Sequence, residues 1–205
     1  GYHDDGACQP RTDLEWQRWA QDVKGKIVIA GQGFEDYVQR LCAAGAAGLI
    51  HIWGSAETAL HEETVGPVWG TPEPDDFLRY PRLPVISVNH QDGQRLLAQY
   101  QQHPLMTLEI ATELNFHVAE CSMPVVEIPG SSPEFVLLSS HYDSWHEGVT
   151  DNATGNALCL AMAIHIHQQP QTLLRGLRII WLSGHSNARY GGSAWYADNY
   201  RQQLK

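Results

Sequence analysis

Two short motifs bring together side chains of the types that bind metal ions. The first is His141-Tyr142-Asp143, and the second is Asp151-Asn152-Ala153-Thr154-Gly155. Neutral imidazole and carboxylate groups are preferred ligands of zinc, and two metal ions a few ångströms apart need a carboxylate that binds both. His141 and Asp151 are therefore candidate metal ligands, and Asp151 is a candidate bridge between two divalent ions.

The segments around these motifs predict that they meet at one edge of a sheet. Residues 135–138 and 177–182 are apolar runs, of which the first is typical of a strand buried on both faces of a parallel sheet. Apolar residues at helical spacing predict a helix between them, from about Asn152 to His167, with Asp151 or Asn152 as its N-cap. A strand, helix and strand form a right-handed crossover unit, and such sheets bind ligands outside the carboxyl ends of their strands. Both motifs are expected at that edge.

The paired motifs resemble those of the co-catalytic zinc exopeptidases, the superfamily of bacterial aminopeptidases, glutamate carboxypeptidase and transferrin receptor. The resemblance covers roughly residues 120–205 and includes the run Val126-Glu127-Ile128-Pro129-Gly130. It implies that His141 binds one of two zinc ions, that Asp143 orients His141, and that Asp151 bridges the ions. It also implies a peptide substrate, hydrolysed by water that the metal ions activate, as in aminopeptidases.

The next motif of that superfamily is different in this sequence. Where the family usually has two adjacent glutamates, a general base and a metal ligand, this chain has Gly184-His185-Ser186. His185 is the best substitute, because imidazole binds metals and transfers protons near neutral pH. The family takes further ligands, an acid and a histidine, from segments beyond the position of Lys205. We therefore expect either part of a longer enzyme or a relative that has lost catalysis, and an isolated chain without activity.

The amino-terminal half predicts a separate module. Its pattern comprises a β-run at 24–30, a helix at 34–44, and a helix end that turns into a strand over 43–52. A β-run at 83–88 then leads into a helix with Leu96 and Leu97, and period-two alternation follows at 106–111. This order resembles the protease-associated domain found in many of the same exopeptidases. We therefore expect an α/β chain in three parts: an N-terminal segment (1–23), a protease-associated-like domain (24–114), and the first part of a zinc-peptidase domain with a mostly parallel sheet (115–205).

Composition excludes some functions and leaves others open. Thirteen basic and twenty-three acidic residues give a net charge of −10, which argues against a nucleic-acid partner. No apolar run approaches the roughly 18 residues of a membrane-spanning helix. No signal segment is recognisable, and the sequence is compatible with both a secreted and a cytoplasmic location. It also leaves open whether the chain forms a homo-oligomer and which residues bind substrate. The cysteines, expected to be mostly buried thiols with one disulfide open, are Cys8, Cys42, Cys121 and Cys159.

Two other functions stay open. Loss of both glutamates fits a non-catalytic binding module of the same fold, as in the transferrin receptor branch. Residues 184–188 also resemble the nucleophile elbow of serine α/β-hydrolases, with Ser186 as the nucleophile. Against the elbow, the next helix is expected to begin only at Ala194, with Ser193 as its cap, and no acid and histidine follow in chain order.

Overall fold

The chain forms two compact units. The computed structural model describes residues 2–4, 12–56, 58, 60, 65–66, 69–71, 73–115, 117, 119–169, 172–186 and 189–204. The first unit comprises Gly1–Pro67 with Phe77–Phe116, and the second comprises Val68–Asp76 with His117–Lys205. The predicted boundaries at residues 23 and 114 differ from this division and stay predictions.

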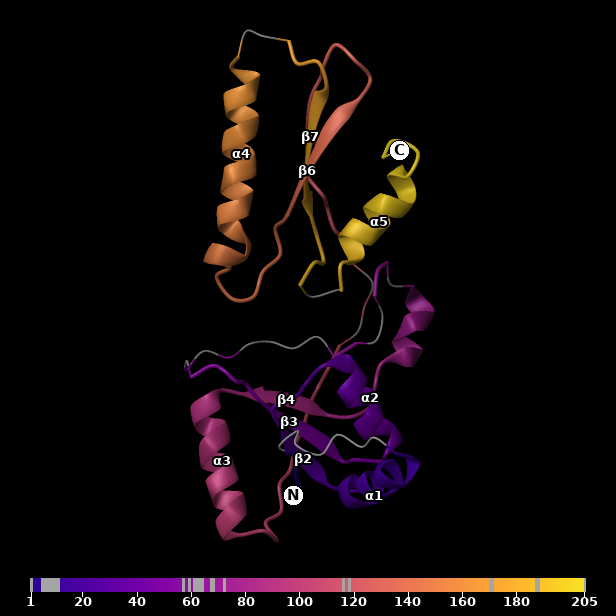
Figure 1. The fold of residues 1–205 in the computed structure, drawn as a ribbon, viewed down its shortest axis with the longest axis vertical. Coiled ribbons are helices and arrows are strands. Elements are labelled where there is room, and N and C mark those ends of the chain that lie inside the picture. The colour runs from indigo at the N-terminus through magenta and orange to yellow at the C-terminus, as the bar shows by residue number, and fades with distance from the viewer. Residues whose placement is uncertain are drawn as a thin grey trace. The chain divides into compact units, whose positions relative to one another are not determined.

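The first unit is a four-stranded parallel sheet between helices. The strands are β1 (Tyr2–Asp4), β2 (Ile27–Ala30), β3 (Gly48–Ile52) and β4 (Val85–Val88), in the order β1-β2-β3-β4. The helices are α1 (Asp13–Val23), α2 (Glu35–Ala43) and α3 (His90–Gln102). A short 3-10 helix, Pro74–Arg79, begins in the second unit and ends in the first. Figure 1 shows α3 on one side of the sheet and α1 and α2 on the other.

Strand β2 divides its side chains between the two faces of this sheet. Val28 and Ala30 pack in one core with residues of α1 and α2, whereas Ile29 packs in a second core with residues of α3. Because both faces are covered, the strand reads as an unbroken apolar run in the sequence. Trp19 and Val23 of α1 belong to the first core, so the helix within the expected N-terminal segment is part of this unit.

Most of the predicted elements of this unit form. The expected helix at 34–44 and the β-runs are observed, but no strand occurs at 106–111, which the structure describes in full. The alternation there reflects packing of Leu108 and Ile110 against the second core, which lies on the α3 side of the sheet, rather than pairing in the sheet. That this unit is a protease-associated domain stays a prediction.

The second unit is a mixed three-stranded sheet with a helix on each side. Strands β5 (Val125–Ile128), β6 (Phe135–His141) and β7 (Gly176–Leu182) lie in the order β5-β7-β6, with β6 parallel and β5 antiparallel to β7. Helix α4 (Thr154–His167) lies on one side and α5 (Gly191–Tyr200) on the other (Figure 1). The predicted α/β fold class is confirmed.

Two local predictions for this unit are wrong. Strand β6 is not buried on both faces, because it lies at the edge of the sheet and exposes 55% of Val136. Helix α4 begins at Thr154 after an irregular turn, Val149–Ala153, and Asp151 and Asn152 have non-helical backbone angles. Neither residue caps the helix, because their side chains instead contact residues of β6.

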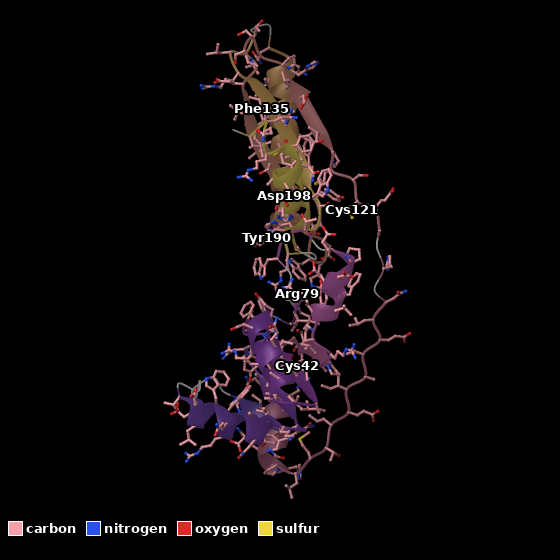
Figure 2. The ribbon with its side chains drawn as sticks, turned by 90° about the vertical axis from the view of Figure 1, so that its right-hand side faces the viewer. Cys42, Arg79, Cys121, Phe135, Tyr190 and Asp198 are labelled. Atoms are coloured by element: carbon pink, nitrogen blue, oxygen red, sulfur yellow. The ribbon has the colours of Figure 1, made fainter. Side chains whose placement is uncertain are left out.

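The prediction of mostly buried thiols is also wrong. Cys42 and Cys121, labelled in Figure 2, are exposed, and only Cys159 is buried among the three free cysteines that the structure describes. Cys42 lies near the end of α2, and Cys121 precedes β5. Cys8 lies outside the described residues. Within the described part of the chain, no helix has the length and apolar character needed to cross a membrane.

Candidate active site

The two motifs lie where neighbouring strands of the second unit end. His141 is the last residue of β6 and pairs with Leu182, the last residue of β7. Tyr142 then donates its backbone N–H to the Leu182 carbonyl, 3.0 Å away. The segments that follow the two strands, with Asp143 in one and His185 in the other, therefore begin side by side at the carboxyl edge of the sheet.

His141 and Asp151 converge at this edge. The His141 Nε2 atom is 2.9 Å from Asp151 Oδ1. The His141 side chain is only 9% exposed, whereas that of Asp151 is 63% exposed. The imidazole is therefore fixed by its surroundings, and the carboxylate opens the pair to solvent. Their role as metal ligands stays a prediction.

A backbone contact fixes the orientation of the His141 ring. Its Nδ1 atom is 2.8 Å from the Asp143 backbone carbonyl, which can only accept, so Nδ1 carries a proton. In the neutral ring, Nε2 then directs a lone pair toward Asp151, and two acceptors face each other across 2.9 Å. A proton or a cation shared between them stabilises such a pair, and this arrangement is typical of a metal-ligating histidine.

The Asp143 carboxylate has a different task from the one expected. Its Oδ1 atom lies 3.8 Å from His141 Nδ1, too far for a hydrogen bond, so the backbone carbonyl rather than the carboxylate orients that ring. The carboxylate instead accepts the backbone N–H groups of His185 at 3.1 Å and Ser186 at 2.7 Å. Asp143 thus joins the segment after β6 to the segment after β7.

His185 lies directly against His141. The two imidazole rings are stacked with centroids 3.9 Å apart and an interplanar angle of 14°. Burial, and then the proximity of His141, lower the pKa of His185 below 6.5, although Asp143 and Asp151 act in the opposite direction. His185 is therefore neutral at neutral pH, which is the form that can accept a proton.

The turn that carries Asp151 is held by a polar network. Asn152 Nδ2 donates to the hydroxyl of Ser140, which in turn donates to Asn156 Oδ1, at 3.1 and 2.8 Å. A side chain at Gly155 would collide with the Asn152 amide, so the close approach of the turn to α4 requires glycine there. These contacts give a physical reason for the Asn and Gly of the second motif.

The donor atoms fit zinc in type but not in number. His141 supplies an imidazole nitrogen and Asp151 a carboxylate oxygen, whereas a zinc site ordinarily has three or four protein ligands. Across the residues that the structure describes, no group of three or more His, Cys, Asp or Glu side chains is arranged to hold a metal ion. Two donor atoms fall short of the number that a complete zinc site needs.

The serine alternative loses support from the surroundings of Ser186. Its side chain is buried, and its N–H is bound to Asp143, whereas a nucleophile elbow exposes the serine hydroxyl. Helix α5 begins at Gly191, earlier than expected, and Ser193 does not cap it but donates to the Tyr190 carbonyl inside its first turn. Residues 187–188 of the proposed elbow lie outside the described residues.

Two aromatic residues that were not among the predicted site residues extend from the site. The Tyr190 ring meets the His185 ring edge to face, with centroids 4.7 Å apart. The Trp69 ring lies 5.5 Å from the Tyr190 ring. Figure 2 places Tyr190 far from Phe135, the first residue of β6, and thus at the end of the unit where β6 finishes. The glycine-rich turn that follows Tyr190 is a signal that could have identified Tyr190, but no local pattern connects Trp69 with Tyr190.

Comparison with known proteins shows similarity to one peptidase family. Residues 125–205 match Peptidase family M28. The fold resembles a peptidase M28 precursor from Shewanella amazonensis SB2B (20% identity, TM-score 0.67, covering 90% of this chain and 47% of that one). It also resembles BSAP, a zinc aminopeptidase from Bacillus subtilis (18% identity, TM-score 0.57, covering 82% and 38%). A third similar structure is an aminopeptidase from Aneurinibacillus sp. strain AM-1 (17% identity, TM-score 0.56, covering 94% and 46%).

These likenesses establish the fold, and the chain spans less than half the length of each of these structures. No sequence among the curated proteins matches. The predicted resemblance to the co-catalytic zinc exopeptidase superfamily is confirmed by the match of residues 125–205 to its peptidase family M28.

Proposed function

We propose that this chain is part of a zinc-dependent metallopeptidase that hydrolyses peptides in the manner of an aminopeptidase. The observation that carries the proposal is the 2.9 Å approach of His141 Nε2 and Asp151 Oδ1 at the carboxyl edge of the sheet. A buried imidazole with its other nitrogen bound to a carbonyl, facing a carboxylate that solvent reaches, is what a catalytic zinc ion requires of two of its ligands.

The surrounding residues have distinct roles in this proposal. His141 and Asp151 hold zinc, which when bound lowers the pKa of water and polarises a peptide carbonyl. His185, neutral and stacked on His141, accepts a proton in the place where the family has a glutamate. Asp143 is a positioning residue, because it fixes His141 through its carbonyl and His185 through its carboxylate.

Zinc titration of the chain by isothermal calorimetry tests the proposed ligands. We expect the wild type to bind zinc. The affinity for zinc should be lower by roughly tenfold or more in His141→Ala and in Asp151→Ala, because each variant removes a donor atom. His165→Ala is the matched control, since His165 is exposed near the end of α4, and it should bind zinc as the wild type does. No uptake, or equal uptake by all four proteins, would contradict the proposed metal site.

A non-catalytic binding module is the second candidate, and one observation favours it. Ser186, in the segment where the family usually has its two glutamates, is buried and cannot supply a carboxylate. The two functions separate when the full-length polypeptide is assayed on aminoacyl and acyl-peptide substrates. Peptide hydrolysis whose pH profile moves in His185→Gln supports the enzyme, whereas zinc binding without hydrolysis supports the binding module.

A further inference from the structure

A row of four rings leads from solvent to the candidate metal ligands in the second unit. Counted over the whole residue, His141 is 7% exposed, Tyr190 is 42% exposed and Trp69 is 55% exposed. His185, which is half-buried, lies between His141 and Tyr190. Successive ring centroids along the row are 3.9, 4.7 and 5.5 Å apart. We call these four residues the aromatic wall.

Trp69 is held in the aromatic wall although it comes from a distant part of the sequence. The Gly70 N–H donates to the Arg189 carbonyl at 3.0 Å, and the Arg189 guanidinium lies 4.8 Å from the centre of the Trp69 ring. Gly70 has a φ of +94°, a conformation that other residues rarely adopt. The backbone of residues 69–71 is thus shaped to present Trp69 to the segment that follows β7.

We propose that Trp69 and Tyr190 bind the apolar side chain of the peptide residue next to the bond that is cleaved. This inference rests on the proposed function and makes residues 69–71 part of its substrate-binding surface. A peptide whose carbonyl approaches His141 and Asp151 has the aromatic wall beside it, because the wall begins at His141 and continues through His185 and Tyr190 to Trp69. Trp and Tyr rings provide large, rigid apolar surfaces, and covering them favours a bulky apolar or aromatic side chain over a small one.

Binding of amino-acid amides tests this preference without requiring catalysis. Calorimetric titrations of the zinc-supplemented chain compare phenylalaninamide with alaninamide, for the wild type, Trp69→Ala, Trp69→Phe and Trp195→Ala. Trp195 is the matched control, because it is 42% exposed but lines a separate cavity of about 570 Å³ between α5 and strands β5 and β7. We expect the wild type to bind phenylalaninamide about tenfold more tightly than alaninamide.

The variants separate a binding role from a structural one. Trp69→Ala should remove most of the preference and change the affinity for alaninamide by less than about twofold, whereas Trp69→Phe and Trp195→Ala should keep the preference. Equal weakening of both ligands in Trp69→Ala would show a structural role and overturn the inference. Failure of the wild type to bind phenylalaninamide or to prefer it would overturn it too, whatever the zinc titrations show. A preference that depends on Trp69, in a full-length protein that hydrolyses no peptide, would contradict the proposed function alone.

Discussion

The two units of the chain treat their apolar residues differently. In the first unit, helices cover both faces of the sheet, and β2 and β3 are almost fully buried. In the second unit, β7 is the buried central strand, but the edge strand β6 exposes more than a third of both Val136 and Leu137. An apolar run thus marks a buried strand in one unit and a half-covered one in the other.

The helices repeat this contrast. Helix α2 buries Tyr37, Val38 and Leu41 on one side and exposes polar residues on the other. Helix α4 carries apolar residues on all sides, buries Cys159 and Ala163 against the sheet, and leaves half or more of Leu158, Leu160 and Ile164 exposed. A helix that is apolar all round is ordinarily enclosed by protein. The first unit therefore covers both faces of its sheet with the apolar sides of its helices, whereas α4 of the second unit presents an apolar outer surface suited to further protein contacts.

The sharpest test of this contrast substitutes one leucine in each unit. Leu41→Ala empties a fully buried site and should lower the free energy of unfolding of the first unit by about 2–5 kcal/mol. Leu160→Ala removes a half-exposed side chain and should cost the second unit less than about 1 kcal/mol. Hydrogen exchange measured by mass spectrometry on peptides from each unit reads the two effects separately. Similar costs would show that α4 is covered in solution and would break the contrast.

The stability of the second unit should depend more on the Asp143 carboxylate than on the exposed apolar residues of α4. Asp143→Ala leaves two backbone N–H groups without their acceptor and should cost about 1.5–3 kcal/mol in the second unit. Asp198→Ala is the matched control, because Asp198 is exposed on α5 (Figure 2), and it should change stability by less than about 0.5 kcal/mol. Unfolding in urea, followed by hydrogen exchange in peptides that cover residues 183–186, measures the loss of stability in both variants. A neutral Asp143→Ala would mean that the segment after β7 is held by other contacts.

The smallest expected effect is a pH dependence confined to the second unit. Because the pKa of His185 is lowered in the folded state, the unfolded chain takes up this proton at higher pH than the folded chain. The stability that depends on neutral His185 is complete above pH 6.5 and decreases as the pH falls below that value. His185→Gln should flatten this decrease, whereas His165→Gln, at an exposed position, should not. Stability curves that stay parallel in the wild type and His185→Gln would contradict the lowered pKa.

The sequence predicted the elements and the meeting of the two motifs, because these follow from local periodicity. Apolar runs identified β6 and β7, and the rule that ligands bind at the carboxyl ends of strands placed His141 and Asp151 at one edge. The exposure of β6 escaped prediction, because an apolar run reports the character of a strand and not the presence of a neighbour on each side.

The contacts of the site were harder to predict than its location. The interaction of the Asp143 carboxylate with backbone N–H groups more than forty residues away leaves no periodic trace in the sequence. Trp69 is joined to Tyr190 by a fold of the chain that no motif encodes. The turn at Asp151 was mistaken for a helix cap, because Asp and Asn before an apolar helix are also the usual capping residues.

The Asp143 carboxylate holds the segment after β7 through backbone N–H groups, which every residue except proline carries. Position 185 is therefore free to change its side chain while keeping its place beside His141. Replacing His185 with glutamate would put a carboxylate beside His141 and keep both backbone hydrogen bonds to Asp143. The chemistry of this position can be rewritten independently of its architecture.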